Sequence, residues 1–361
     1  MQNPNHYVII MAGGIGSRFW PMSRSSFPKQ FHDILGTGHT LIQDTFKRFS
    51  SIVPSQNIYV VTNERYFDLV KEQIPEMSDD QILLEPIGRN TAPCVAYAAY
   101  KIKKLNPNAV FVVAPSDALI QKEEVFKEKI LLGLNVCTGE DRIVTLGITP
   151  TRPDTGYGYI QFFVDEENKG YFKVKTFTEK PPLELARQFV DSGDFVWNAG
   201  IFLFSASTID QAFKTFLPDM AEKFTSIEGH YYQDGEKDAI SKTYSSCDSI
   251  SMDNGIMEKA ENVYVIPAEF GWSDLGTWGS VHSNTPKDYH QNAVQGEVVA
   301  YDSYNNMVKT TREGKIVIMK GLEGFIVVDT DDALLICKKD DEQFIKQIVG
   351  DLKSSKGEPY V

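Results

Sequence analysis

The sequence has few of the residues that build disulfide frameworks or zinc sites. Its 361 residues include six histidines and only four cysteines, Cys94, Cys137, Cys247 and Cys337. The cysteines form no Cys-x-x-Cys pair, and the histidines share no ligand spacing with them. A structural zinc site is therefore not expected, and we predict a reduced, cytoplasmic protein.

Long hydrophobic runs are also missing. No apolar run approaches the roughly eighteen residues that a membrane-spanning helix needs. The N-terminus lacks the order of basic, apolar and small residues that marks a signal peptide. We therefore expect neither membrane insertion nor export.

The chain lacks an excess of positive charge. It carries 49 acidic and 36 basic residues, a formal net charge of −13. Nucleic acids favour broad basic surfaces, so a nucleic-acid partner is not expected. A small phosphorylated ligand remains possible, because it needs only a local group of cations, helped by a divalent metal.

Two common glycine motifs are absent. Phe19 stands where the third glycine of the dinucleotide motif G-x-G-x-x-G would lie, and no acidic residue ends the next strand. The P-loop ends in Gly-Lys-Ser or Gly-Lys-Thr, and neither sequence occurs in the chain. A hydride-transfer enzyme and a P-loop kinase are therefore both disfavoured.

The chain does contain a different glycine-rich turn, which directly follows an apolar run at residues 7–10. Gly13, Gly14 and Gly16 allow a sharp turn and a close approach of the backbone to a ligand. Arg18 and Lys29 follow at short range and could bind phosphoryl groups. The combination predicts a nucleoside triphosphate site. The alternative, a simple tight turn with solvated cations, requires these features to coincide by chance.

The length and the 42% hydrophobic content predict a large domain with a smaller one beside it. Buried strands alternate with helical patterns up to about residue 146, which predicts an α/β fold on a mostly parallel, mixed sheet. These strands are expected at residues 7–11, 58–62, 82–84, 110–114 and 143–146. A long helix is expected from Thr91 to about residue 105.

The alternation loosens after residue 151, with strands expected at 157–163, 172–177 and 198–205 and a helix at 183–190. After about residue 286, short β-rich runs predict a small β module. Those runs cover residues 298–300, 307–308, 316–319, 325–328 and 334–337. A helical pattern follows at 342–352, and residues 353–361 are expected to fray. We therefore predict one domain over residues 1–285 and a β-rich module over 286–361 that ends in a helix.

Two aspartates lie where ligands of open α/β sheets are usually bound. Asp117 follows the strand expected at 110–114, and Asp274 lies in a tight, partly apolar turn, FGWSDLGTW. Two carboxylates together with substrate phosphates are a usual way to hold Mg²⁺. Taken alone, Asp117 could equally be a helix cap or a turn residue.

Seven ordered motifs resemble those of the mannose-1-phosphate guanylyltransferases, also called GDP-mannose pyrophosphorylases, within the sugar nucleotidyltransferases. The motifs are AGGIGSRFWPMSRSSFPKQF, LLEPIGRNTAPCVAYAA, VVAPSDALI, TRPDTGYGYI, FTEKP, WNAGIFLF and FGWSDLGTW. The C-terminal stretch GLEGFIVVDTDDALLICKKDDEQ looks like the end of the short, monofunctional members. The resemblance implies a Rossmann-like nucleotidyltransferase domain, a β-helix-like C-terminal module, and no appended isomerase activity.

The resemblance also implies a reaction. GMP would pass from GTP to α-D-mannose 1-phosphate, giving GDP-mannose and pyrophosphate by an in-line displacement assisted by Mg²⁺. Arg18 and Lys29 would hold the triphosphate, and Asp117 and Asp274 would bind the metal. No covalent intermediate is needed.

Base selection is expected in the motif EPIGRNTAP, because the Glu85 carboxylate can accept hydrogen bonds from both guanine donors. A solvated carboxylate at a strand end is the alternative for this residue. The predicted nucleotide-binding residues are Ala12, Gly13, Gly14, Gly16, Ser17, Glu85, Gly88, Arg89, Asn90 and Thr91. Arg89 would either reach a phosphate or brace the loop.

The sugar phosphate is expected to bind at Gly158, Glu179, Lys180 and Asn198, whose groups suit sugar hydroxyls and a phosphate. Two other functions remain open: a sugar nucleotidyltransferase for UTP, dTTP or another hexose 1-phosphate, and an inactive paralogue that binds GDP-mannose. The paralogue would be expected to lose Lys29, Asp117 or Asp274, and the sequence keeps all three. A homodimer is a further expectation.

Overall fold

The computed structural model describes residues 2–164 and 169–361, and the chain forms two compact units. The first unit comprises Met1–Gly13, Thr45–Ser116 and Ile120–Trp272, and the second comprises Gly14–Asp44, Asp117–Leu119 and Ser273–Val361. The glycine turn is thus divided, with Gly13 in the first unit and Gly14 in the second. The boundary expected between residues 285 and 286 stays a prediction.

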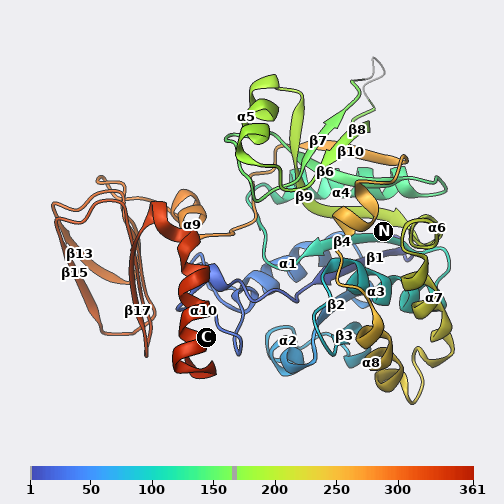
Figure 1. Cartoon of the computed structure of the whole chain (residues 1–361), viewed down its shortest axis with the longest axis horizontal. Helices are drawn as coiled ribbons and strands as arrows, with labels where there is room; N and C mark the ends of the chain where they lie inside the picture. Colours follow the sequence, from blue (N-terminus) through green and yellow to red (C-terminus); the bar gives the residue numbers. More distant parts are fainter. Residues whose placement is uncertain (1, 165–168) are drawn as a thin grey trace. The chain divides into compact units, whose positions relative to one another are not determined.

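The described residues of the first unit build a nine-stranded sheet (Figure 1). Its strands are β1 His6–Met11, β2 Ile58–Asn63, β3 Ile82–Glu85, β4 Val110–Pro115, β6 Ile143–Ile148, β7 Tyr159–Phe162, β8 Phe172–Thr178, β9 Phe195–Ser205 and β10 Val263–Ala268. Their order across the sheet is β3-β2-β1-β4-β9-β6-β10-β8-β7. The strands expected in this part of the sequence are all present, and β10 is an additional one.

The sheet is mixed, as expected. Strands β3, β2, β1 and β4 run parallel to one another, and β6 is parallel to β10. Strand β9 is antiparallel to both β4 and β6, and β8 and β7 are also joined antiparallel. Parallel strands end at the same edge of a sheet, so the carboxyl ends of β1 to β4 meet there. The segments that follow these strands contain several predicted site residues.

Helices cover both faces of this sheet. In the first unit they are α2 Phe67–Gln73, α3 Thr91–Leu105, α4 Glu123–Cys137, α5 Leu183–Ser192, α6 Ala206–Phe216, α7 Pro218–Ser226 and α8 Glu236–Ser246; α1, Leu41–Ser50, has residues in both units. Helices α3, α6, α7 and α8 share one core with Tyr7 and Ile9 of β1. Their neighbours Val8 and Ile10 are also fully buried and point to the opposite face, because successive strand residues alternate. Helix α4 packs against β4, β6, β9 and β10.

Short strands dominate the C-terminal part of the second unit. They are β12 Ala293–Gln295, β13 Glu297–Tyr301, β14 Met307–Thr310, β15 Ile316–Lys320, β16 Phe325–Asp329 and β17 Leu334–Lys338. Strands β12, β14 and β16 pair in parallel, β17 joins antiparallel, and β13 pairs in parallel with β15. Successive parallel strands that alternate between two small sheets produce the expected β-helix-like module. Strands β5, Leu119–Ile120, and β11, Trp272–Ser273, pair with each other in a separate two-stranded sheet.

The second unit has its own apolar core. Phe19 and Trp20 share a core with Trp278 of helix α9, Trp278–Asn284, and with Ile345 of helix α10, Ile345–Lys356. The expectation that residues 353–361 fray is wrong. Helix α10 continues to residue 356, the Trp20 indole Nε1 donates to the Tyr360 carbonyl oxygen at 2.7 Å, and Val361 is buried.

Candidate active site

The first part of the glycine turn lies beside Glu85. The Ala12 N–H donates to the Val61 carbonyl oxygen at 2.8 Å, which extends the pairing of β1 and β2 by one residue. A Cβ atom on Gly13 would lie 3.3 Å from Glu85 Oε2. The carboxyl ends of β1 and β3 thus bring a predicted phosphate-turn glycine against the predicted base-reading carboxylate.

Glu85 is a buried acid, not a solvated strand-end carboxylate. Its side chain is 5% exposed, and the Tyr244 hydroxyl of α8 donates to Oε1 at 3.1 Å. Burial raises the pKa of Glu85 to about 7, and the Tyr244 hydrogen bond acts in the opposite direction. A buried acceptor with a fixed orientation suits the recognition of a polar partner, because mismatched partners leave it unsatisfied.

The other residues of the base motif lie at the N-terminal end of α3. Asn90 has a positive φ of 68°, and its Oδ1 accepts a hydrogen bond from the Thr91 N–H at 2.9 Å, capping the helix. The Thr91 hydroxyl accepts from the Met252 N–H at 2.8 Å. A side chain on Gly88 would meet no atom within 4 Å. The loop is therefore anchored at Asn90 and Thr91 and open at Gly88.

Arg89 braces this loop. Its Nε donates to the Tyr244 carbonyl oxygen at 3.2 Å, and its Nη2 donates to the Ser245 carbonyl oxygen at 3.4 Å, both at the end of α8. Carbonyls at a helix C-terminus carry partial negative charge, so a guanidinium is stabilised there. Of the two roles expected for Arg89, these contacts support bracing of the loop.

The predicted sugar residues form one cluster in the first unit. The Asn198 N–H donates to the Gly158 carbonyl oxygen at 2.8 Å. A Cβ on Gly158 would lie 2.6 Å from Glu179 Oε2 and 3.2 Å from the Asn198 Cβ, so a side chain at this position would displace the Glu179 carboxylate. Lys180 forms an ion pair with Glu179. The structure therefore brings together all four residues predicted to contact the sugar phosphate.

Sequence reasoning missed Asp253, which belongs to the same cluster. It begins a π-helical segment, Asp253–Met257 (η7), and Asn198 Nδ2 donates to its Oδ1 at 2.9 Å. Burial and then the nearby charge of Glu179 raise the pKa of Asp253 to about 6. Short π-helical segments are frequent at functional sites. In the sequence, the segment SMDNGIMEK offered only a turn-like pattern, so Asp253 gave no recognisable signal there.

Glu258, which directly follows this π-helical segment as its C-terminal cap, was also missed. Its Oε1 accepts a hydrogen bond from the Glu179 N–H at 3.1 Å, and its Oε2 accepts from the Asn254 side chain at 3.0 Å. The segment and its C-terminal cap therefore contact the sugar cluster at two points, through the carboxylates of Asp253 and Glu258.

In the second unit, the glycine turn packs against Lys29. Gly16 has φ 73° and precedes the 3-10 turn Ser17–Phe19 (η1), and a Cβ on Gly16 would lie 2.5 Å from the Lys29 Cβ. The Lys29 N–H donates to the Ile15 carbonyl oxygen at 3.1 Å. A side chain at Gly14 would meet nothing within 4 Å. Gly16 is thus required for packing, and Gly14 leaves the turn open to an approaching ligand.

Lys29 links the two predicted metal ligands. Its Nζ donates to Asp117 Oδ2 at 2.9 Å and to the Asp274 carbonyl oxygen at 2.9 Å, and its side chain is 3% exposed. Asp274 Oδ1 accepts from the Gly276 N–H at 3.1 Å, which fixes the turn after β11. Residues 29, 117 and 274 are widely separated in sequence, and the fold brings them together around one buried ammonium group.

A metal ion at these carboxylates would depend on other ligands. Over residues 2–164 and 169–361, no group of three or more His, Cys, Asp or Glu side chains is placed to hold a metal ion. Two carboxylates are nevertheless the usual protein contribution to a Mg²⁺ site that is completed by substrate phosphates and water. The residues present therefore fit a divalent ion that arrives with a phosphorylated substrate.

Arg18 is exposed on η1 and is bound through one nitrogen. Its Nε donates to Gln343 Oε1 at 2.8 Å. Gln343 belongs to the 3-10 segment Lys339–Phe344 (η8), which precedes α10. The predicted phosphate-binding arginine is thus contacted by a residue near the C-terminus of the chain.

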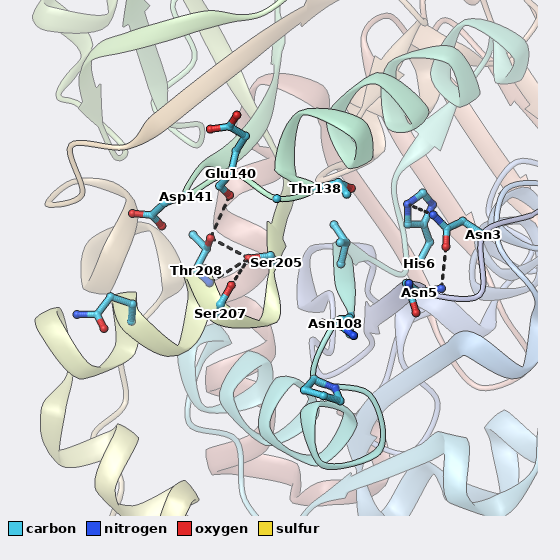
Figure 2. Close-up of a pocket in the computed structure, with 15 residues that line it drawn as sticks. Asn3, Asn5, His6, Asn108, Thr138, Glu140, Asp141, Ser205, Ser207 and Thr208 are labelled. Carbon is cyan, nitrogen blue, oxygen red and sulfur yellow. Dashed lines mark hydrogen bonds between the residues drawn. The ribbon is translucent and has the colours of Figure 1, made fainter.

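A cavity of about 590 Å³ lies elsewhere in the first unit (Figure 2). Asn3, Asn108, Thr138, Ser205 and Thr208 are among its lining residues. His6 and Val110, which also line it, begin β1 and β4, so the cavity lies at the amino ends of these strands. The residues that line it include none of the predicted site residues.

Comparison with protein families identifies the class of this protein. Residues 7–291 match the family described as Nucleotidyl transferase, and residues 296–352 match the MannoseP isomerase/GMP-like beta-helix domain. The chain therefore belongs to the nucleotidyl transferase family, and it is an enzyme of that class. In residues 2–164 and 169–361, none of the helices combines the length and the apolar character of a membrane-spanning segment.

Individual relatives agree with this assignment. The chain is 37% identical to "Mannose-1-phosphate guanylyltransferase 2" of Escherichia coli O157:H7 over 98% of its own length and 74% of that protein. It is also 37% identical to "Alginate biosynthesis protein AlgA" of Pseudomonas syringae pv. tomato, over 95% of its own length and 71% of that protein. A crystal structure described as that of "mannose-1-phosphate geranyltransferase from Thermus thermophilus" matches with a TM-score of 0.87 and 30% identity, over 97% of this chain and 99% of that one. The resemblance to the mannose-1-phosphate guanylyltransferases found in the sequence is confirmed.

Proposed function

We propose that the protein transfers GMP from GTP to α-D-mannose 1-phosphate, giving GDP-mannose and pyrophosphate. The observation that carries this proposal is the buried Lys29 ammonium held by Asp117 and by the Asp274 backbone beside the glycine turn. The likeness to mannose-1-phosphate guanylyltransferases over nearly the whole chain supports the choice of substrates.

The proposed reaction is a direct displacement at phosphorus. A phosphate oxygen of mannose 1-phosphate attacks the α-phosphorus of GTP and forms a new P–O bond. The bond between the α-phosphorus and the bridging oxygen of the β-phosphate breaks, and pyrophosphate leaves with that oxygen. Because no side chain acts as a nucleophile, catalysis rests on alignment and on neutralisation of charge.

In this proposal Arg18 and Lys29 bind the triphosphate and stabilise the charge that develops on the leaving pyrophosphate. Ala12, Gly13, Gly14, Gly16 and Ser17 form the backbone turn that faces the phosphates. Asp117 and Asp274 would hold Mg²⁺, which, when bound, supplies further neutralisation of the phosphate oxygens. The ammonium of Lys29 keeps the Asp117 carboxylate oriented in the absence of substrate.

We propose that Glu85 accepts hydrogen bonds from the guanine N1–H and exocyclic amine, supported by its burial and by the Tyr244 hydrogen bond. Gly88, Asn90 and Thr91 would contact the base and ribose. Glu179 and Asn198 would bind sugar hydroxyls, Gly158 would allow the sugar to approach, and Lys180 would bind the sugar's phosphate. Arg89 would act on the nucleotide only by bracing its loop.

The decisive experiment is an assay of pyrophosphate release with Mg²⁺, mannose 1-phosphate and each nucleoside triphosphate in turn. We expect strong preference for GTP, and loss of release in the variants Asp117→Asn and Asp274→Asn. Asp219→Asn, at an exposed position in the first turn of α7, serves as the matched control and should keep full activity. Release only with UTP or dTTP would overturn the substrate assignment.

A folded protein that binds GDP-mannose but releases no pyrophosphate with any triphosphate would overturn the enzymatic proposal in favour of a regulatory role. Removal of divalent ions with a chelator should abolish release, and comparing Mg²⁺ with Mn²⁺ in the restoration step tests the choice of metal.

We also propose a cytoplasmic homodimer. The four cysteines are free thiols, which supports a reducing compartment.

An exposed apolar face supports the dimer. Ile316 and Ile318 of β15 are 53% and 65% exposed, and Val299 of β13 lies beside Ile318 in the same small sheet. Such an exposed apolar face is typical of a surface that is covered by a partner. Light scattering of the purified protein tests the oligomeric state, and Ile318→Lys should yield monomers if this face is the interface.

A further inference from the structure

Two consecutive residues near the C-terminus contact two different parts of the proposed phosphate and metal machinery. Gln343 Oε1 accepts a hydrogen bond from Arg18 Nε at 2.8 Å. Glu342 Oε2 accepts a hydrogen bond from the Gly279 N–H at 2.7 Å. Gly279 lies five residues after Asp274, in the first turn of α9. All of these residues belong to the second unit.

The contact of Glu342 is close-packed. A Cβ on Gly279 would lie 2.9 Å from both Glu342 carboxylate oxygens, so a side chain at position 279 would displace the carboxylate. Burial raises the pKa of Glu342, while the Gly279 N–H and the charge of Arg18 act in the opposite direction. Glu342 is therefore a partly buried acceptor that binds the backbone in the first turn of α9 and interacts electrostatically with the guanidinium of Arg18.

The surrounding core holds η8 in place. Phe19, the residue after Arg18, packs edge-on against Trp278, the residue before Gly279, with ring centroids 5.1 Å apart. Helix α10, which follows η8, packs against η1, and its Ile345 is fully buried in the same core. Contacts made by Glu342 and Gln343 thus rest on rigid elements rather than on a solvated tail.

We propose that Glu342 and Gln343 are positioning residues for nucleotidyl transfer: Gln343 sets the orientation of the Arg18 guanidinium, and Glu342 fixes the first turn of α9, which follows the Asp274 turn. This inference rests on the function proposed above. Neither residue needs to touch a substrate. Their effect is exerted through Arg18 and through the loop that carries one of the two carboxylates.

The chemistry of arginine explains why Gln343 matters. A guanidinium offers five N–H donors in a fixed plane, and phosphate is best bound by two parallel donors. When Nε is bound to Gln343, rotation of the plane is restricted and the terminal Nη1 and Nη2 groups are directed as a pair. Without Gln343, the exposed Arg18 side chain samples other rotamers, and orienting it costs free energy in the transition state.

The test is a double-mutant cycle on kcat for pyrophosphate release. Gln343→Ala should lower kcat about tenfold with little change in the KM for mannose 1-phosphate. In an Arg18→Ala background, Gln343→Ala should change kcat less than about twofold, because the residue through which it acts is already gone. Glu342→Ala and Gly279→Ala should each lower kcat. The double variant should lose no more of kcat than either single variant, because both changes break the same contact.

The matched control is Asp341→Asn, which changes an exposed carboxylate next to Glu342 and should leave kcat unchanged. Thermal unfolding of every variant separates positioning from loss of structure. Equal fold-losses from Gln343→Ala in the wild-type and Arg18→Ala backgrounds would overturn the inference, as would a wild-type kcat in Gln343→Ala and Glu342→Ala. Absence of activity in the unmutated protein, by contrast, refutes the proposed function itself.

Discussion

The buried contact between Lys29 and Asp117 gives a prediction whose size follows from the structure. Lys29→Met removes the ammonium and keeps most of the alkyl chain that packs beside Gly16. The ammonium lies 2.9 Å from Asp117 Oδ2 and is carried by a side chain that is 3% exposed. Removing one partner of a buried ion pair costs about 3–5 kcal/mol. Because Asp117 is 33% exposed and water can solvate the remaining carboxylate, we expect a loss of about 2 kcal/mol in the free energy of unfolding.

Urea unfolding at pH 7 of the wild type, Lys29→Met, Asp117→Asn and the double variant measures this contribution. We expect a coupling free energy of about 2 kcal/mol between the two positions. Lys47→Met, at an exposed position in α1, is the control and should unfold like the wild type. A coupling below about 0.5 kcal/mol would refute the reasoning, because the pair would then behave like an exposed one. The same Lys29 variant should lose at least about 100-fold in pyrophosphate release.

Three further variants test the first unit. Glu85→Gln should reduce the preference for GTP over ATP. It should also reduce the pH dependence of the free energy of unfolding, because a carboxyl whose pKa is raised to about 7 in the fold contributes up to about 3 kcal/mol that is present at low pH and is lost between about pH 4.5 and 7. Unfolding at pH 5 and at pH 8 measures this difference. Gly158→Ala should raise the KM for mannose 1-phosphate about tenfold, because the methyl group would meet Glu179 Oε2 at 2.6 Å. Asp253→Ala should have a similar effect on that KM and leave the KM for GTP unchanged, because it leaves the Asn198 amide without its acceptor.

Controls and contrary results are available for each. Gly229→Ala adds a methyl group where nothing lies within 4 Å and should not change the KM for either substrate. Identical pH dependence of stability in the wild type and Glu85→Gln would contradict the raised pKa. Equal effects of Asp253→Ala on both KM values would show that the residue supports the fold rather than the sugar residues.

The strands were largely predictable because the local pattern is strong. The predicted runs that end at Met11, Leu84 and Ala114 are apolar and flanked by turn residues, and the structure places strands there with ends shifted by no more than one residue. Strand β10 was missed because its run, Val263–Ala268, contains Pro267, and proline disfavours a strand within a sheet. The C-terminal tail was misjudged because its anchor, the hydrogen bond from Trp20 to Tyr360, joins residues 340 positions apart.

The contacts within the candidate site were likewise not predictable from local patterns in the sequence. Lys29, Asp117 and Asp274 were selected as separate motifs, and only the structure shows that one ammonium contacts both aspartates. Asp253 and Glu342 carry no motif that distinguishes them from ordinary acidic residues. Their contacts with Asn198 and Gly279 depend on how distant segments pack.

The sequence alone determined the class of fold, the glycine turn and the residue types that phosphate chemistry requires, because strand patterns, glycine spacing and charge are local properties of the chain. The tertiary structure decided which of these residues meet. The burial of Glu85 against Tyr244, the contact of Lys29 with both aspartates and the contact of Gln343 with Arg18 each join residues more than 80 positions apart. Such contacts arise from the packing of strand ends and core residues, and no local pattern encodes them.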